Sequence, residues 1–312
     1  MVDRPRTEFR NMRCRACQRL IKPDTALATS LGRRLTAATR EQCIYRCSCG
    51  VSYSNARDEA RRVMIVASPE LNVPSQVRSG LAEALGQSLN RRNRRNKQMK
   101  FCFEMSEDAV TWTVFRGLQQ QGRLDALAQP QHPAGEPALV IWGAPAGGAR
   151  SSEIVSALAE VCRSLGERAT AFSEPDVVVA WPELVVFVEA KYQSANERRQ
   201  NFHGFPRYLD RAELFAAPPE EVAAAGYYEL TRNWRIGTAL AEALGIPDFL
   251  LVNLGPPDKI EAEAEAFASL LNRSASRDFV FWSWSDILEA AAPIEPWLDR
   301  YASERHRLLY WR

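Results

Sequence analysis

The chain has 312 residues, of which 46% are hydrophobic and 25% are charged, a composition typical of soluble globular proteins. Its length predicts about two domains, since a domain commonly holds ~100–200 residues. The sequence contains no run of about 18 apolar residues, which argues against a transmembrane helix. Its first residues, MVDRPRTEFRNMRCRACQ, lack the apolar stretch of a secretory signal. We therefore expect a soluble, cytoplasmic protein.

The formal net charge of +2 conceals two halves of opposite charge. Residues 1–100 hold 21 Lys and Arg against 8 Asp and Glu, whereas residues 101–312 hold 19 against 30. Such asymmetry predicts a basic module that meets a polyanion, and nucleic acid is the commonest intracellular polyanion. The alternative is an unevenly charged surface that is merely solvated. We expect the two modules to be divided near residue 100.

Five of the seven cysteines fall within 36 residues of the basic module. Clustered cysteines in an intracellular chain indicate metal binding rather than disulfide formation. Four thiolates from two short-spaced pairs can close a tetrahedral zinc site that is structural, because no coordination position stays open. The predicted ligands of this zinc-ribbon-like module are Cys14, Cys17, Cys47 and Cys49. Cys43 could replace one of them, and reduced cysteines packed as small hydrophobic residues are the alternative.

A helix and a strongly basic run are predicted at the end of the first module. Apolar residues recur every four positions from Val77 to Leu89, which predicts a helix from Ser75 to about Lys100. Five of the seven residues at positions 91–97 are cationic. Such a run contacts solvent or phosphates more often than bases. The predicted nucleic-acid contacts are Arg91, Arg92, Arg94, Arg95 and Lys97.

The second module, residues 101–312, has the alternating pattern of an α/β domain. A helical pattern follows Ser106. Strands are predicted at 138–142, 176–181, 184–191, 249–253 and 278–284, and further helices at 151–165, 206–217 and 227–244. The strands at 176–181 and 184–191 are separated by a tight turn, which predicts a β-hairpin.

Three ionisable residues stand at one end of this hairpin. Asp176 begins the first strand, while Glu189 and Lys191 end the second, where strand alternation places them on the same side. The start of one strand lies opposite the end of its partner, so all three can meet. Two such carboxylates can hold Mg²⁺ with Lys191 beside it. The alternative is that Glu189 and Lys191 are ordinary surface residues at a strand end.

The spacing Pro175-Asp176, twelve residues, Glu189-Ala190-Lys191 resembles that of the PD-(D/E)XK nuclease superfamily, which has the restriction-endonuclease-like fold. The resemblance covers roughly residues 101–290 and extends to the order of the predicted elements. It implies a mixed central sheet flanked by helices, and hydrolysis of DNA that depends on Mg²⁺ or Mn²⁺. It also implies that Asp176, Glu189 and the Ala190 carbonyl bind the metal. Lys191 would orient the attacking water or stabilise the transition state.

The resemblance implies further site residues on helices. Many members place a glutamate of the first core helix in the metal site, and Glu107 takes that role here. Glu104 is the competing candidate, and Glu107 could also be a simple helix-start carboxylate. On a later helix, Tyr228 and Arg232 are four residues apart and share a face. Arg232 could clamp a phosphate or be an ordinary surface arginine.

We therefore expect a two-module endonuclease in which a zinc-bound basic module grips DNA, duplex DNA being favoured, and an α/β module hydrolyses it. A role in restriction or antiviral defence is expected by analogy only. Duplex cleavage needs two active sites or two visits, so a homodimer is plausible. One alternative is a catalytically silent DNA-binding or assembly protein on a nuclease-like scaffold. Another is an RNA-directed or repair nuclease.

Overall fold

The computed structural model describes residues 9–36, 39–56, 58–129 and 133–310. Two compact units divide the chain: unit 1 comprises Met1–Asn72 and Gln98–Ser106, and unit 2 comprises Val73–Lys97 and Glu107–Arg312. Among the described helices, none is both long enough and apolar enough to cross a bilayer.

The division is more interleaved than the expected boundary near residue 100. Backbone hydrogen bonds explain the difference. The Leu89 amide donates to the Trp142 carbonyl, 3.0 Å away, which ties residues 73–97 to unit 2. The Val66 amide donates to the Cys102 carbonyl, 2.9 Å away, which returns residues 98–106 to unit 1.

Unit 1 is built from very short elements. Strand β1 (Met12–Arg13) pairs antiparallel with β2 (Leu20–Ile21). Strands β3 (Tyr45–Arg46), β4 (Ser52–Tyr53) and β5 (Met64–Ile65) form a three-stranded antiparallel sheet. Helix α1 (Thr25–Leu31) begins at Asp24, whose side chain accepts a hydrogen bond from the Leu27 amide. The buried apolar core is small and includes Met12, Ile21, Ile44, Tyr45, Tyr53 and Val66. A bound metal would supply much of the folding free energy of such a unit.

The single helix predicted from Ser75 to Lys100 is wrong. The structure has two helices, α2 (Leu81–Gln87) and α3 (Arg94–Phe101). Between them the Leu89 amide is committed to Trp142 rather than to a helical carbonyl. Asn90 and Asn93 also have low helix propensity. The four-residue apolar repeat therefore includes Leu89, although α2 ends at Gln87.

Unit 2 contains a mixed six-stranded sheet in the order β11-β10-β9-β8-β6-β7. The strands are β6 (Ala138–Ile141), β7 (Ala144–Gly147), β8 (Val177–Ala180), β9 (Leu184–Ala190), β10 (Asp248–Leu254) and β11 (Arg277–Trp282). Strands β9, β10 and β11 are parallel, whereas β8 pairs antiparallel with both β9 and β6, and β7 pairs antiparallel with β6. The predicted hairpin is confirmed as β8 and β9.

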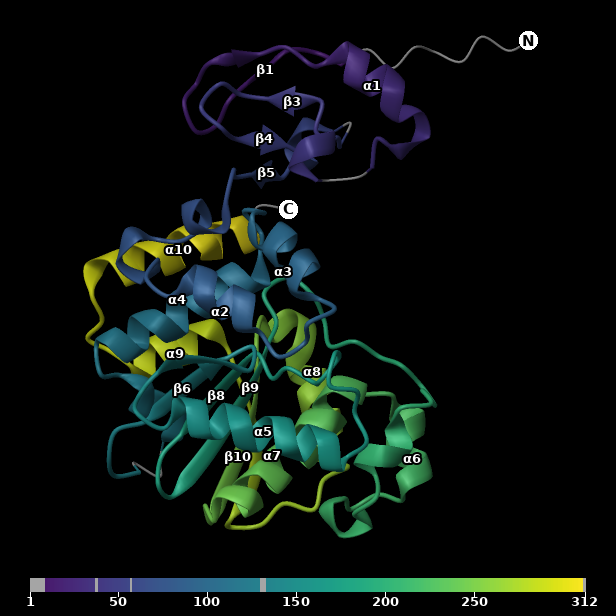
Figure 1. The fold of residues 1–312 in the computed structure, drawn as a ribbon, viewed down its shortest axis with the longest axis vertical. Helices are drawn as coiled ribbons and strands as arrows, with labels where there is room; N and C mark the ends of the chain where they lie inside the picture. Colours follow the sequence, from purple (N-terminus) through teal and green to yellow (C-terminus); the bar gives the residue numbers. More distant parts are fainter. Residues whose placement is uncertain (1–8, 37–38, 57, 130–132, 311–312) are drawn as a thin grey trace. The chain divides into compact units, whose positions relative to one another are not determined.

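Helices flank this sheet, which confirms the α/β class with a mixed central sheet. They are α4 (Glu107–Gln120), α5 (Ser151–Ser164), α6 (Pro219–Ala225), α7 (Tyr228–Leu244), α8 (Pro257–Ala268), α9 (Trp284–Ala290) and α10 (Pro296–Tyr310). Helices α5 and α7 run side by side across the strands (Figure 1). Their buried side chains, such as Leu158 and Trp234, share one core with Val178 of β8 and Phe187 of β9.

One predicted helix of unit 2 is wrong, namely the helix over 206–217. The segment instead forms two 3-10 turns, Phe205–Tyr208 and Ala212–Leu214. The Leu214 carbonyl accepts hydrogen bonds from the Trp234 indole, 3.1 Å away, and from the Asn272 amide, 3.0 Å away. Tertiary partners have therefore replaced the helical hydrogen bond at this carbonyl.

Candidate active site and four-cysteine centre

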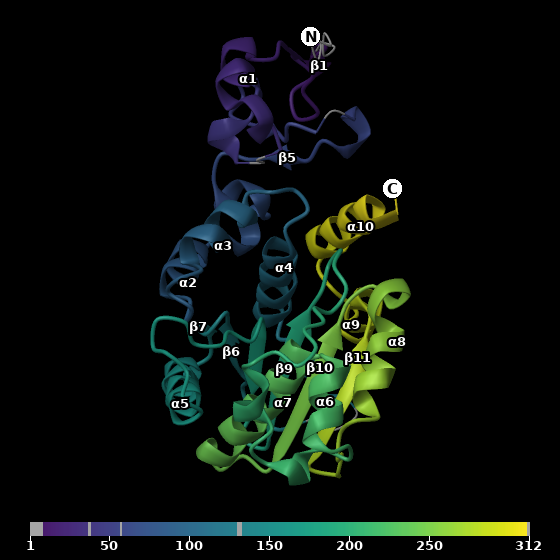
Figure 2. The ribbon, with the colours of Figure 1, turned by 90° about the vertical axis from the view of Figure 1, so that its right-hand side faces the viewer.

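Asp176 and Glu189 are brought to the same edge of the sheet by the β8–β9 pairing. Val177 pairs with Val188, so the next positions outward, Asp176 and Glu189, face each other. The Ala190 amide donates to Asp176 Oδ2 at 2.9 Å. Strand β10 ends at this edge too (Figure 2). Its Asn253 pairs with Glu189 of β9. The site therefore lies at the carboxyl ends of β9 and β10.

Lys191 forms ion pairs with two glutamates of the site. Its ammonium lies 2.6 Å from Glu189 Oε1 and 2.9 Å from Glu229 Oε2. The second oxygen of Glu189 accepts a hydrogen bond from Asn233 Nδ2 at 2.7 Å. Glu189 and Lys191 are both buried, so neither is an ordinary strand-end surface residue. Their charges are compensated by each other and by helix α7, from which Glu229 and Asn233 come.

Of the two competing glutamates, Glu107 belongs to this part of unit 2. It is the first residue of α4, and its Oε2 accepts hydrogen bonds from the Tyr192 amide at 2.7 Å and the Ser194 hydroxyl at 3.1 Å. Glu104 lies in unit 1. There its Oε1 accepts from Arg15, 2.8 Å away, and from the Met64 amide, 3.0 Å away. Glu107 is therefore the candidate site residue.

Burial dominates the electrostatics of the carboxylates. It raises the pKa of Asp176 well above the ordinary value, an effect that the charge of Glu189 reinforces. Burial likewise raises the pKa of Glu189 and that of Glu107. Burial alone would lower the pKa of Lys191, but the negative charges of Glu189 and Glu229 raise it instead. Burial also opposes ionisation of Glu229, but the positive charges of Lys191 and Arg232 lower its pKa. The Lys191 ammonium therefore lies among carboxyl groups whose pKa values are shifted in opposite directions.

Helix α7 contributes more to the site than the sequence interpretation recognised. The predicted pair is adjacent, since the Arg232 guanidinium lies 5.9 Å from the Tyr228 ring centroid. The pKa of Arg232 is affected first by burial, which lowers it, and then by Glu229 and Glu189, which raise it overall. Arg232 Nε also donates to Asn233 Oδ1 at 3.3 Å, and Asn233 in turn donates to Glu189, so Arg232 lies beside the candidate site. Glu229 and Asn233 were missed, although their spacing of four residues places them on one helical face.

The predicted nucleic-acid contacts at positions 91–97 differ in their exposure to solvent. Arg91, Arg92 and Arg95 are exposed, whereas Arg94 is half-buried and donates from Nε to the Ser88 carbonyl at 2.8 Å. Lys97 is buried, and its burial removes it from any cationic surface.

Lys97 instead makes three interactions inside unit 2. Its ammonium lies 3.2 Å from Glu174, 3.5 Å from Asp108 and 4.8 Å from the centroid of the Trp142 ring. Asp108 follows Glu107, and Glu174 lies two residues before Asp176. Lys97 therefore connects the two segments that carry these candidate site carboxylates.

The four predicted zinc ligands are drawn together in unit 1. The Sγ atoms of Cys14, Cys17, Cys47 and Cys49 all lie within 4.8 Å of one another. Such a cluster can bind a structural metal such as zinc. Among the described residues, it is the one group of three or more His, Cys, Asp or Glu side chains with ligand atoms this close. The carboxylates of unit 2 therefore converge less tightly than the thiols.

Tyr53 contacts the cysteine cluster through its hydroxyl group. Its hydroxyl lies 3.3 Å from Cys14 Sγ and accepts a hydrogen bond from the Arg15 amide at 2.7 Å. Burial opposes ionisation of Cys14, but the Tyr53 hydroxyl and backbone N–H groups lower its pKa to about 6. Cys43 lies outside the cluster, donates to the Thr39 carbonyl, and has a pKa raised by burial to about 12. Cys43 does not replace a ligand in this arrangement.

No protein-family model, no curated protein and no solved structure matches the chain.

Proposed function

We propose that the chain is an endonuclease that uses a divalent metal ion to hydrolyse phosphodiester bonds of DNA. The observation that carries the proposal is the polar site at the adjoining ends of β8 and β9, where Glu189 and Lys191 are buried and Asp176 is half-buried, with half-buried Glu107 at the start of α4. Buried ionisable groups are costly, and they concentrate where chemistry needs them. The resemblance of the motif to the PD-(D/E)XK superfamily, with its restriction-endonuclease-like core, supports the same proposal.

Lys191 is the residue proposed to act on the reacting atoms. Its ammonium, held by Glu189 and Glu229, can donate to the attacking water or to a non-bridging oxygen of the phosphodiester. A donor fixed in place before the reaction stabilises the charge that develops on the phosphate. Water would attack the phosphorus directly and lose a proton, the P–O bond to the leaving sugar oxygen would break, and that oxygen would gain a proton, without a covalent enzyme intermediate.

The donor set suits a hard divalent cation. Asp176, Glu189 and Glu107 offer carboxylate oxygens, the ligands that Mg²⁺ and Mn²⁺ prefer, and the Ala190 carbonyl is a further oxygen ligand implied by the family resemblance. The raised pKa values of these carboxyl groups are consistent with a cluster that needs additional positive charge. A bound divalent ion would supply Lewis-acid stabilisation of the phosphate. Glu189 would exchange part of its contact with Lys191 for the ion.

Cationic surfaces in both units are proposed to bind the DNA backbone. In unit 1 the exposed Arg13, Arg19 and Arg46 are close in sequence to the cysteine pairs. In unit 2 the exposed Arg91, Arg92 and Arg95 form the remaining part of the basic run. Arginine binds phosphate without regard to base sequence. Structural zinc in unit 1 would fix the first of these surfaces.

Plasmid cleavage tests the proposal. Supercoiled DNA is incubated with Mg²⁺, with Mn²⁺ or with EDTA, and Asp176→Asn and Glu189→Gln are compared with the exposed controls Asp258→Asn and Glu221→Gln. The proposal predicts nicking or linearisation that EDTA and both site substitutions abolish and both controls retain. Cleavage that survives the site substitutions would contradict the assignment of the site. RNA of matched sequence in the same assay separates a DNA nuclease from an RNA nuclease.

One observation favours a second candidate function, a catalytically silent DNA-binding scaffold. Both oxygens of Glu189 already have protein partners, Lys191 and Asn233. Such a self-compensated cluster could serve stability alone. Tight DNA binding with no cleavage in any metal would favour the scaffold. The intact set of Asp176, Glu189 and Lys191 favours the enzyme.

A further inference from the structure

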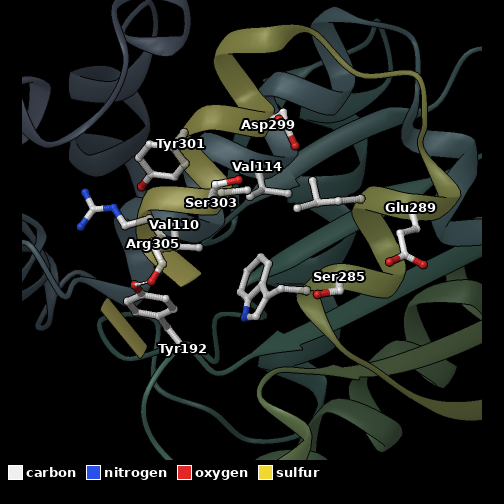
Figure 3. A pocket seen from close by; sticks show the side chains of 12 residues that line it. Val110, Val114, Tyr192, Ser285, Glu289, Asp299, Tyr301, Ser303 and Arg305 are labelled. Atoms are coloured by element: carbon white, nitrogen blue, oxygen red, sulfur yellow. Dashed lines mark hydrogen bonds between the residues drawn. The ribbon is translucent and has the colours of Figure 1, made fainter. Parts of the chain in front are cut away.

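A cavity of about 420 Å³ lies in unit 2 between helices α4, α9 and α10 (Figure 3). Its volume falls in the ordinary range of ligand pockets. The inner wall is apolar and aromatic and includes Val110, Val114, Trp284 and Tyr301. The exposed residues Glu289, Asp299 and Ser303 contribute to its lining. The cavity therefore combines stacking surfaces with hydrogen-bond acceptors.

Two residues that line this cavity form hydrogen bonds with residues of the candidate active site. The Trp284 indole donates to the backbone carbonyl of Lys191 at 2.9 Å. Tyr192, which follows Lys191, lines the cavity with its side chain while its amide donates to Glu107. On α4, Glu107, Val110 and Val114 are spaced by three and four residues, so they share a face. The cavity wall therefore contacts the backbone of Lys191, the residue proposed to act on the phosphodiester.

The charges around the cavity select the kind of ligand. Glu289 and Asp299 accept hydrogen bonds but repel phosphate. The basic side chain in the lining, Arg305, has its guanidinium 5.0 Å from the centroid of the Tyr301 ring. A nucleobase suits this environment, since it is neutral, has faces that stack on aromatic rings and carries N–H donors for carboxylates.

We propose that this cavity accepts one unstacked nucleobase of the strand that lies across the active site. The proposal rests on the proposed nuclease function and names its substrate class: DNA with an unpaired or mismatched base. Removing a base from an intact duplex is costly, and least so where the base is already mismatched or single-stranded. Stacking on aromatic side chains recovers part of that cost. The cavity therefore favours distorted over perfect duplex.

The test uses binding in EDTA, so that it does not depend on cleavage. The probes are a fluorescein-labelled perfect duplex and the same duplex with one mismatched 2-aminopurine. Ser303→Trp adds bulk in the cavity lining from an exposed position, and Arg300→Trp adds the same bulk at an exposed, non-lining position of α10. The proposal predicts that wild type prefers the mismatched probe by about tenfold and quenches its 2-aminopurine, as aromatic stacking implies.

Ser303→Trp should lose both the preference and the quenching, and Arg300→Trp should keep them. Equal affinity of wild type for the two probes, or a preference that Ser303→Trp leaves unchanged, overturns the assignment of the cavity. Plasmid cleavage by the same wild-type preparation separates this failure from failure of the proposed function. A chain that cleaves the plasmid without any preference contradicts the cavity assignment alone. A chain that neither binds nor cleaves DNA contradicts both.

Discussion

Lys191 and Glu189, two residues apart at the end of β9, form a buried ion pair of 2.6 Å that helix α7 completes. Glu229 lies 2.9 Å from the same ammonium, and Asn233 binds the other oxygen of Glu189. An ion pair held on both sides has one orientation rather than several. The orientation of Lys191 toward a substrate therefore depends on α7.

Glu229→Gln should weaken cleavage without abolishing it. The substitution removes one negative partner of Lys191 while keeping the size and a hydrogen-bond acceptor. Loss of a supporting partner of this kind typically costs about 10- to 100-fold in activity. Single-turnover cleavage rates at saturating DNA would measure the effect. Glu221→Gln, at an exposed position of α6, is the control and should leave the rate unchanged.

Asp176→Asn should stabilise the metal-free protein at neutral pH. Burial raises the folded-state pKa of Asp176, so folding favours the protonated carboxyl. The contribution of the protonated Asp176 carboxyl to stability is fully present below its unfolded-state pKa of about 3.9. It is lost as the pH rises through the higher folded-state pKa. Removing the buried charge should therefore add about 1 kcal/mol at pH 7 in EDTA and almost nothing at pH 4. Urea unfolding at both pH values measures this.

Asp210→Asn is the matched control, and its predicted change in folding stability at pH 7 has the opposite sign. Hydrogen bonds from Arg235 lower the pKa of Asp210, so its charged form favours folding above the unfolded pKa. The substitution should lower stability at pH 7, with a smaller loss at low pH. An Asp176→Asn variant that is also destabilised at pH 7 would contradict a folded-state pKa of Asp176 that burial raises.

Lys97→Met should act on stability, whereas substitutions at Arg91 and Arg95 should act on DNA binding. Lys97 is buried against Glu174 and Asp108, and removing one partner from a buried ionic cluster typically costs about 3–5 kcal/mol. Arg91→Ala and Arg95→Ala remove exposed charges. Each should leave stability unchanged and reduce the slope of log Kd against log salt by about 1.

Chemical unfolding and DNA-binding titrations at several salt concentrations measure both quantities. If Lys97→Met folds with wild-type stability but flattens the salt dependence of binding, the structural role assigned to Lys97 is wrong.

Zinc should be bound stoichiometrically by unit 1 and be needed for its folding. Metal analysis should find about one zinc per chain, as expected for a four-thiolate site. Cys47→Ser should lose the metal, and Cys43→Ser should retain it, because Cys43 lies outside the cluster. Cobalt substitution provides a second readout, since thiolate ligation gives intense visible absorption. Retention of zinc by Cys47→Ser together with its loss from Cys43→Ser would reverse the ligand assignment.

Much of the α/β module could be predicted because its strands are short apolar runs with clear ends. The strands around Ala138, Val177, Leu184 and Phe249 were found in this way. Edge strand β7 was missed because its residues, Ala-Pro-Ala-Gly, have low β-propensity and its pairing with β6 is a tertiary effect.

The sequence predicted only those site residues that belong to one short motif. Asp176, Glu189 and Lys191 form a motif, so their meeting could be inferred from strand pairing. The role of Lys97 could not, because its partners Asp108 and Glu174 are remote in sequence and a cation within a basic run looks exposed. Glu229 follows Tyr228, which the sequence analysis singled out, but only the folded structure shows that Glu229 contacts Lys191.

The most direct test of the proposed active site is plasmid cleavage by Lys191→Met in Mg²⁺, beside the matched variant Lys259→Met. Lys259 is an exposed lysine of α8 that donates to the Gln193 carbonyl. We predict that wild type and Lys259→Met nick the plasmid in a reaction that EDTA stops, whereas Lys191→Met binds DNA but does not cut it. Equal cleavage by the two lysine variants would contradict the assignment of Lys191, and with it the proposed active site.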